Sequence, residues 1–362
     1  MQFEPQTTIQ STEPVNMTAK FIRKRLNCSI LSVFLLFFQS GHGQDALKGL
    51  ESVLTTYSSV LGPDVVVLVH KDGKTIYQRE SPSLKIKTEA PIASCSKWLT
   101  AALVMILVDE GKLSLDDKVS KFIPIMDNYS KGFITIRQCL THTSGIEADP
   151  PGLMRLMERN RFSTLEEEVT NIISKKAIED NAGTAFRYSG VGLNIAGRVL
   201  EIISKKSFDR LITEKLLRPL NMKNTSFTPE RGPVNPSGGA RSTANDYMNF
   251  LDMILSKGVF NGKRILSEVS VMEMQKEQYP GIPVRFTPQV AAGYGYGIGE
   301  WIQEKDATGR SLVLCSPGLF GTWPYVDLTR NYSCIIFEKG LLSVQKKDAY
   351  LKIKEAIDGL IQ

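Results

Sequence analysis

Hydrophobic positions divide the chain into a β-rich beginning, a long helical middle and a β-rich end. Residues 64–70 form a run rich in β-branched side chains, and a turn signal at 71–74 leads to a second strand-like run at 75–78. Residues from about 120 to 275 have mostly helical spacing, and helical spacing also occurs at 45–61 and 342–361. Strand patterns return in four segments, at 294–301, 311–315, 321–326 and 332–337.

These patterns predict one sheet whose strands come from both ends of the chain. The helical stretch between them, about 120–275, is then an insertion packed against the sheet. We therefore expect an α+β fold with an antiparallel sheet flanked by helices.

A helical run that begins near residue 94 carries the strongest candidate chemistry. Residues 101–108 are apolar nearly all round, which indicates a helix buried on every side. Ser94 and Lys97 stand three residues apart at its start and share one face. A neutral Lys97 amine accepts the Ser94 proton, and the positive helix end favours the charge that develops. The alternative is a helix-capping Ser with a solvated Lys, because Ser-x-x-Lys arises readily by chance.

Composition fits a soluble globular protein of one large domain or two. The 362 residues are 42% hydrophobic and 23% charged. The formal net charge of +6 is spread along the chain, so nothing predicts a nucleic-acid partner. The sequence shows neither a cluster of metal ligands nor a Gly-rich phosphate loop, so we expect no metal and no cofactor.

Residues 20–43 have the layout of an export signal. Four basic side chains at 20–25 precede a short apolar core at 30–38, and small and polar residues continue to Gly43. The core is far shorter than the roughly 20 apolar residues that span a bilayer, although an uncleaved anchor is the alternative. We expect residues 1–43 to be an extension with an export signal, and residues 44–362 to form the domain of a periplasmic or secreted protein. We expect the start of the protein to be Met1 or Met17.

Four cysteines follow the signal, and an exported protein could pair them in disulfides. At this chain length the favoured interpretation is that they are buried free thiols. They are Cys95, Cys139, Cys315 and Cys334.

Four further segments, together with Ser94, resemble the serine β-lactamase and penicillin-binding-protein superfamily, specifically its class C β-lactamase-like branch. Residues 111–117 (Gly-Lys-Leu-Ser-Leu-Asp-Asp) resemble the stretch after the nucleophile helix, and 140–146 (Leu-Thr-His-Thr-Ser-Gly-Ile) match the branch's signature. Residues 238–246 and the Tyr-Gly-Tyr-Gly run at 294–297 resemble its later segments. The resemblance covers about 45–362 and implies the β-lactamase/transpeptidase-like fold, with Ser94 as nucleophile.

The second catalytic element of this superfamily is Tyr-x-Asn, and Tyr188-Ser189-Gly190 is its match here. The resemblance implies that Tyr188 carries protons together with Lys97. A phenol needs a nearby ammonium to act as a base near neutral pH. Gly190 departs from the pattern, so the usual amide contact to the substrate is missing. The alternative for Tyr188 is a packed side chain with a satisfied hydroxyl.

The third element is usually Lys-Thr-Gly or His-x-Gly on an inner strand, and Ser316-Pro317-Gly318 takes its place here. Ser316 can hydrogen-bond to a substrate but cannot supply a positive charge. Gly318 lets the backbone approach the substrate closely. The Leu319 N–H would join the Ser94 N–H in an oxyanion hole. The alternative is an ordinary strand followed by a turn.

The resemblance implies a serine hydrolase that forms a covalent acyl-enzyme on an ester, amide or peptidoglycan-like substrate. The departures at Gly190 and Ser316 favour a carboxylesterase or a D-amino-acid peptidase. The alternatives are a true class C-like β-lactamase and a non-hydrolysing member that binds penicillin or peptidoglycan. A Ser-His-Asp triad is a poor competitor because no Gly-x-Ser-x-Gly elbow occurs, and we expect His142 to hold its loop by hydrogen bonds.

Overall fold

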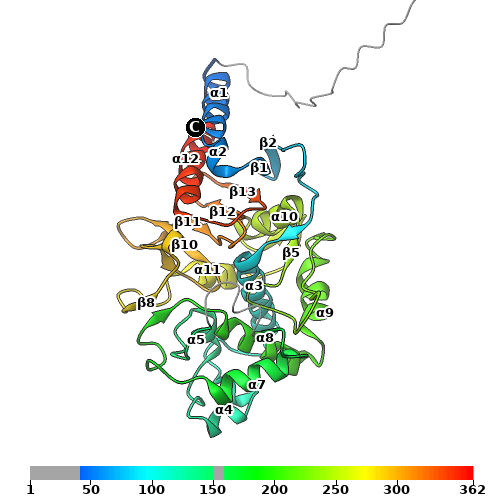
Figure 1. Cartoon of the computed structure of the whole chain (residues 1–362), viewed down its shortest axis with the longest axis vertical. Coiled ribbons are helices and arrows are strands. Elements are labelled where there is room, and N and C mark those ends of the chain that lie inside the picture. The colour runs from blue at the N-terminus through cyan, green and yellow to red at the C-terminus, as the bar shows by residue number, and fades with distance from the viewer. Residues whose placement is uncertain (1–40, 150–158, 362) are drawn as a thin grey trace, which may run out of the picture.

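A seven-stranded antiparallel sheet joins the two ends of the chain. The computed structural model describes residues 41–149 and 159–361. Within the sheet the strand order is β2-β1-β13-β12-β11-β10-β9, and Val67 of β1 pairs with Ile336 of β13. The prediction of one sheet built from both termini is therefore confirmed (Figure 1). The strands are β1 (Val65–Lys71), β2 (Lys74–Arg79), β9 (Gly295–Tyr296), β10 (Trp301–Lys305), β11 (Ser311–Cys315), β12 (Trp323–Asp327) and β13 (Tyr332–Glu338).

The prediction of a single strand at 294–301 is wrong, because this segment forms a tight hairpin. Tyr296 of β9 pairs with Trp301 of β10, and residues 297–300 form the turn between them. Gly299 has a φ of +82°, and a Cβ there would lie 2.4 Å from the Cβ of Ala101. Only glycine combines this backbone conformation with so close an approach to a helix. The alternating pattern that predicted a single strand therefore hid a turn.

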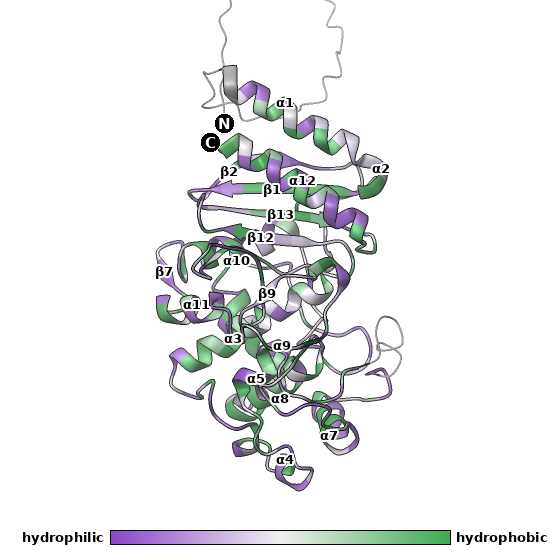
Figure 2. Ribbon diagram, turned by 90° about the vertical axis from the view of Figure 1, so that its left-hand side faces the viewer, coloured by the Kyte–Doolittle hydropathy of each residue, from purple (hydrophilic) through white to green (hydrophobic). Residues whose placement is uncertain are grey.

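The sheet separates two hydrophobic cores, as the alternation of side chains in β1 shows. Val65, Val67 and Val69 pack in a cluster with side chains of α1 (Gly41–Thr56), α2 (Ser58–Leu61) and α12 (Val344–Ile361). Val66 and Leu68 point to the other face, where α10 (Ala244–Leu255) lies. In Figure 2, α1 lies above the strands, α12 crosses over β1 and β13, and α10 lies beneath β12. The predicted terminal helices are thus confirmed.

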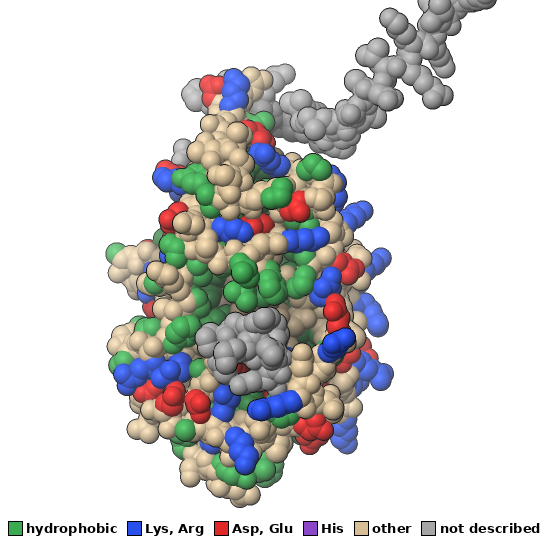
Figure 3. Space-filling view, in the orientation of Figure 1, with side chains coloured by type: hydrophobic (Ala, Val, Ile, Leu, Met, Phe, Trp, Pro, Cys, Tyr) green, Lys and Arg blue, Asp and Glu red, His purple; other side chains and the backbone are tan. Residues whose placement is uncertain are grey.

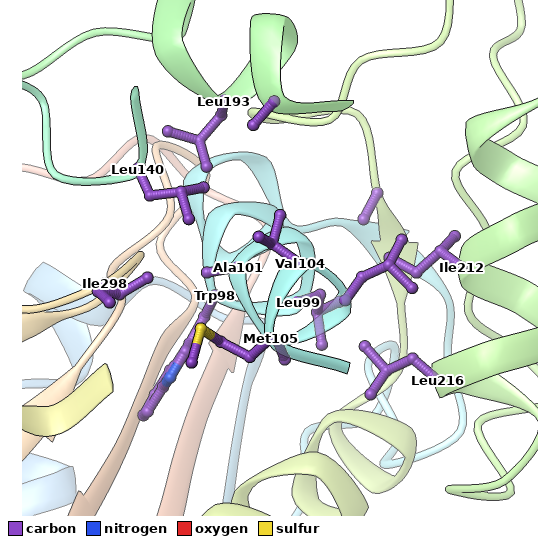
Figure 4. Close-up of a cluster of buried hydrophobic side chains, with 14 of the residues drawn as sticks. Trp98, Leu99, Ala101, Val104, Met105, Leu140, Leu193, Ile212, Leu216 and Ile298 are labelled. Atoms are coloured by element: carbon purple, nitrogen blue, oxygen red, sulfur yellow. The ribbon is translucent and has the colours of Figure 1, made fainter. Parts of the chain in front are cut away.

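Helix α3 (Ser96–Asp109) runs through the centre of the larger core, and a 3-10 turn, η1 (Ala93–Cys95), leads into it. Every residue from Ser96 to Leu107 is buried, which confirms the prediction from its apolar surface. Trp98 packs edge-on against Phe250 of α10 with ring centroids 5.6 Å apart. In Figure 4 the helix is surrounded by Leu140, Leu193, Ile212, Leu216 and Ile298, which come from several different elements. Such complete burial fixes the position of the turn that precedes the helix.

The insertion between the sheet's two halves is mostly helical, as predicted, and forms the lower part of the molecule in Figure 1. Two short strand pairs join it to flanking segments, β3 (Ala90–Pro91) with β5 (Arg241–Ser242) and β4 (Phe186–Arg187) with β8 (Val284–Phe286), and one lies within it, β6 (Val259–Phe260) with β7 (Lys263–Arg264). Its helical elements are η2 (Val119–Lys121), α4 (Ile125–Asn128), α5 (Ile136–Leu140), α7 (Leu165–Lys175), α8 (Val191–Ser204), α9 (Phe208–Ile212), the π-helical turn η3 (Thr213–Leu217), α10 and α11 (Glu268–Gln275), and η4 (Gln289–Ala291) follows it.

The N-terminal predictions fall largely outside the described residues. The basic and apolar parts of the predicted export signal, at 20–38, belong to that undescribed part, and α1 begins at Gly41, just before the predicted domain boundary. Among the described helices, none combines the length and the apolar character needed to cross a bilayer. Cys95, Cys139, Cys315 and Cys334 are all buried and free, so the interpretation as unpaired thiols is confirmed.

Candidate active site

Ser94 lies in the 3-10 turn before α3, one step earlier than the first helical turn in which the sequence placed it. Its neighbour Ala93 has a φ of +45°, an uncommon conformation for a residue with a side chain. The Ser96 hydroxyl donates to the Ala93 carbonyl at 2.6 Å and accepts from the Ala240 N–H at 3.0 Å. The Tyr247 hydroxyl donates to the Cys95 carbonyl at 2.8 Å. These bonds hold a strained turn that leaves Ser94 half-buried at the surface.

Lys97 connects the residues that the sequence proposed as catalytic. Its side chain is 1% exposed, and its Nζ donates to the Ser94 Oγ at 3.1 Å and to the Ser237 carbonyl at 2.7 Å. The same Nζ lies 4.8 Å from the centre of the Tyr188 ring. The structure therefore brings Ser94, Lys97 and Tyr188 together, although they come from η1, α3 and the segment after β4.

Tyr188 is held between aromatic side chains. Its N–H donates to the Phe286 carbonyl at 3.0 Å, which ties it to β8. Its ring lies 4.5 Å from the His142 ring and 5.0 Å from the Trp301 ring, measured between centroids. This packing limits the rotation of the phenol and fixes its position beside Lys97.

His142 supports this arrangement, as predicted, by hydrogen bonds that hold its loop. The Ser189 N–H donates to His142 Nδ1 at 3.3 Å, so a neutral imidazole carries its proton on Nε2. That nitrogen lies 2.9 Å from the Tyr296 hydroxyl. Burial raises the pKa of Tyr296 well above its usual value, and this phenol therefore stays protonated. His142 thus joins the segment after Tyr188 to β9.

The segment predicted as the third catalytic element lies beside the turn that carries Ser94. The pairing of β11 with β12 continues past Cys315, because the Gly318 N–H donates to the Thr322 carbonyl at 2.8 Å. A Cβ at Gly318 would lie 2.4 Å from the Ile92 carbonyl oxygen and 3.0 Å from the Cys95 sulfur. Glycine is therefore required for this hairpin to pack against the turn that carries Ser94.

Ser316 and Leu319 occupy different positions on this hairpin. Ser316 is 3% exposed, and its hydroxyl donates a long bond of 3.4 Å to the Ser94 carbonyl. Leu319 lies at the hairpin tip with its side chain half exposed, and its carbonyl accepts from the Leu342 N–H at 2.8 Å. Gly190 is buried at the start of α8, two residues after Tyr188. The roles of Ser316, Gly318, Leu319 and Gly190 toward a substrate stay predictions.

Sequence reasoning missed two features of this site. The Ser237 carbonyl that accepts from Lys97 is a backbone group, and no side-chain pattern announces it; only its place next to the Gly238-Gly239 pair could have drawn attention to it. The second is Glu300, which is fully buried in the turn between β9 and β10. Within the described part of the chain, neither of its carboxyl oxygens nor the Trp98 Nε1 has a hydrogen-bond partner.

Three buried acidic groups near Ser94, those of Glu300, Cys95 and Cys315, have raised pKa values. Burial raises the pKa of Glu300 well above its usual value; the nearby Trp98 indole N–H opposes this rise only in part, although the two groups form no hydrogen bond. Burial also raises the pKa values of the Cys95 and Cys315 thiols, so neither is a competing nucleophile near neutral pH. Among residues 41–149 and 159–361, no group of three His, Cys, Asp or Glu side chains is placed to hold a metal ion.

Comparison with known proteins identifies the family of the chain. Residues 59–356 match the Beta-lactamase family. The D-alanyl-D-alanine-carboxypeptidase/endopeptidase AmpH of Escherichia coli (strain K12) is 26% identical over 293 residues, which are 74% of this chain and 74% of that protein. Protein flp of Staphylococcus aureus (strain MW2) is 32% identical over 176 residues, and this chain spans only 35% of its length.

Solved structures extend the likeness to the whole fold. A Bacteroides dorei DSM 17855 protein assigned as a β-lactamase has a TM-score of 0.77 and 29% identity, with 87% of this chain and 98% of that chain covered. EstCE1, a hydrolase with promiscuous acyltransferase activity, has a TM-score of 0.71 over 88% of this chain and 100% of that chain. At 20% identity the second likeness shows the fold alone. The chain belongs to the β-lactamase family, within the β-lactamase and penicillin-binding-protein superfamily of serine hydrolases.

Proposed function

We propose that the protein hydrolyses esters through a covalent acyl-enzyme on Ser94. The observation that carries this proposal is the 3.1 Å contact between Lys97 Nζ and Ser94 Oγ, made by a lysine that is 1% exposed. A lysine amine held against a serine hydroxyl in this way is placed to accept the proton of that serine. The cluster around it has the nucleophile, the base and a second proton carrier within one contact network.

The reaction follows from these positions. Ser94 Oγ attacks the carbonyl carbon, and its proton passes to Lys97 and Tyr188. The N–H groups of Ser94 and Leu319 stabilise the oxyanion, and the leaving group departs with a proton from the Tyr188 side. A water molecule then attacks the acyl group by the same route in reverse, which restores Ser94.

A neutral ester suits the surroundings of Ser94 better than a substrate that carries a carboxylate. Ser316 takes the place of a cation, is buried, and directs its hydroxyl to the Ser94 carbonyl. Leu319 and Phe286 expose apolar side chains, and the Phe286 carbonyl binds the Tyr188 N–H. Hydrophobic side chains gather across the middle of the face shown in Figure 3, with charged side chains mostly around them. Apolar acyl groups gain free energy by covering such a surface.

A D-amino-acid peptidase is the second candidate. Its support is the match to the AmpH carboxypeptidase/endopeptidase over 74% of both chains. We expect β-lactam hydrolysis to be slow. Gly190 lacks the side-chain amide, and Ser316 lacks the positive charge, that would bind the carboxylate of a β-lactam.

The test is a hydrolysis screen over short-chain esters, D-Ala-D-Ala peptides and penicillins, with Ser94→Ala as the control. We expect ester turnover that depends on Ser94. Turnover of D-Ala-D-Ala peptides with esters untouched would replace the first proposal by the second. A protein that is labelled by penicillin but turns over nothing would instead be a non-hydrolysing binder.

We also propose that the protein is exported to the periplasm or secreted. The support is the basic and then apolar layout of residues 20–38. Esters, amides and peptidoglycan fragments outside the cytoplasm would then be its substrates.

A further inference from the structure

A chain of buried polar groups runs from α7 and α8 to the loop that holds Lys97. The Asn194 Oδ1 on α8 accepts from the Ser237 N–H at 3.2 Å, and its Nδ2 donates to the Glu168 Oε1 on α7 at 3.0 Å. Glu168 is paired with Arg159, whose Nε lies 2.6 Å from the same oxygen. Arg159 Nη2 then donates to the Val234 carbonyl at 2.9 Å. This series of hydrogen bonds therefore starts and ends on the same loop, at residues 234 and 237.

These groups lie deep inside the protein. Asn194 and Ser237 are 0% exposed, Glu168 is 3% exposed and Arg159 is 7% exposed. Buried polar groups are costly unless each finds a partner, and here the charge of Glu168 is compensated by Arg159. These hydrogen bonds fix the loop at 234–237 in one position, because moving any one of the bonded groups would leave another buried polar group unpaired.

The loop, in turn, is bonded to the nucleophile helix. The Ser237 carbonyl accepts from Lys97 Nζ at 2.7 Å, and the carbonyl of Pro236 accepts from the Thr100 hydroxyl at 2.6 Å. Asn194 thus holds Ser237 by its N–H, in the peptide unit before this residue, and the Ser237 carbonyl, in the next peptide unit, accepts from Lys97. The position of Lys97 Nζ beside Ser94 depends on where that carbonyl lies.

We infer that Asn194 is a positioning residue for catalysis: backed by the Glu168–Arg159 pair, it orients the Ser237 carbonyl so that Lys97 points its amine at Ser94. Asn194 itself touches neither Ser94 nor Lys97 in the described contacts, so it acts only through Ser237. The inference rests on the proposed function of Ser94 and Lys97. No part of the family signature quoted above contains Asn194, Glu168 or Arg159.

The experiment measures how fast a fluorophosphonate labels Ser94. In this reaction Ser94 Oγ bonds to phosphorus, fluoride leaves, and the serine proton passes to Lys97. The first variant is Asn194→Leu, which keeps a side chain of similar size but removes both hydrogen bonds. Val199→Ala, which opens a small cavity elsewhere on α8, is the matched control. All variants are made in the full chain, and both the final labelled fraction and the rate per labelled site are recorded.

The two readouts separate positioning from simple stability. We expect Asn194→Leu to slow labelling per site by about tenfold, the effect of one lost neutral hydrogen bond on a rate. Val199→Ala should label at the wild-type rate, even where it lowers the labelled fraction. A wild-type rate in Asn194→Leu, with only a smaller labelled fraction, would overturn the inference. An unlabelled wild-type protein would overturn the proposed function instead.

A charge exchange gives a second test that also serves if Asn194→Leu does not fold. Asn194→Asp places a second carboxylate beside Glu168 and should slow labelling by tenfold or more. Adding Glu168→Gln restores one donor between the two positions and returns the group, Arg159 included, to one negative and one positive charge. The rate of the double variant should recover several-fold over Asn194→Asp alone. A fast Asn194→Asp variant, or no recovery in the double variant, would contradict the inference.

Discussion

Replacing Glu300 by glutamine should change how the stability of the protein depends on pH. Glu300 is fully buried without a hydrogen-bond partner for either oxygen among the described residues, and burial raises its pKa well above the usual value. An unfolded glutamate has a pKa near 4.3. Above that pH the unfolded chain gains stability by ionising, while the folded carboxyl stays protonated. The contribution of Glu300 is therefore intact below about pH 4 and is lost as the pH rises toward its folded pKa.

The magnitude follows from linkage. Each pH unit between the two pKa values lowers the free energy of unfolding by about 1.4 kcal/mol. Above the unfolded pKa the wild-type protein should thus lose stability through this one group with a slope of up to about 1.4 kcal/mol per pH unit. Glutamine has nearly the same shape and does not ionise, so Glu300→Gln should lack this loss. Near pH 4 the two proteins should differ least, because the Glu300 carboxyl is then neutral in the folded protein and largely protonated in the unfolded chain.

Urea unfolding near pH 5 and pH 7.5 measures the effect. Glu230→Gln is the control, because the Glu230 side chain is 84% exposed and its change should leave the pH slope as in the wild type. If Glu300→Gln and the wild type have the same pH slope, Glu300 is ionised in the folded protein, and the burial argument fails.

Three further changes test the site and the export signal. Gly318→Ala should lower ester turnover by about 100-fold in a folded protein, because its Cβ would lie 2.4 Å from the Ile92 carbonyl and displace the Ser94 turn; wild-type kcat/KM would refute this packing. Ser316→Lys should raise the ratio of kcat/KM for a penicillin to that for a neutral ester by about 10- to 100-fold, as one charge-assisted hydrogen bond allows. An unchanged ratio would show that position 316 does not face the substrate carboxylate. Intact-mass analysis of the exported protein should show a start shortly after Gly43, whereas retention of residues 34–38 would contradict cleavage.

Local sequence patterns were sufficient to predict much of this fold. The β-branched run in β1, the turn after it and the apolar surface of α3 each depend on neighbouring residues, and each lies where the sequence placed it. The hairpin between β9 and β10 was missed because the need for Gly299 comes from α3, which is distant in sequence. The identity of a strand is a local property, whereas a turn pressed against a helix is a tertiary one.

In the candidate site, too, features with a local sequence signal were predicted and features that depend on tertiary packing were not. Ser94, Lys97 and Tyr188 were predicted because their chemistry and motifs are visible in the sequence, and the structure brings them into one contact network. The Ser237 carbonyl was not found because backbone groups carry no sequence signal. Glu300 was missed for another reason: a charged residue in a strand-like pattern suggests exposure, and only the packed structure shows its burial.

The central claim is that Ser94 is the nucleophile that Lys97 activates. The direct measurement is peptide mass spectrometry of the protein after reaction with a fluorophosphonate, in the wild type, Ser94→Ala and Lys97→Ala. We predict one modified peptide that contains Ser94 in the wild type, none in folded Ser94→Ala, and labelling at least about 100-fold slower in Lys97→Ala, because general-base assistance contributes on this scale. Labelling at another residue, or undiminished ester turnover in Ser94→Ala, would contradict the account.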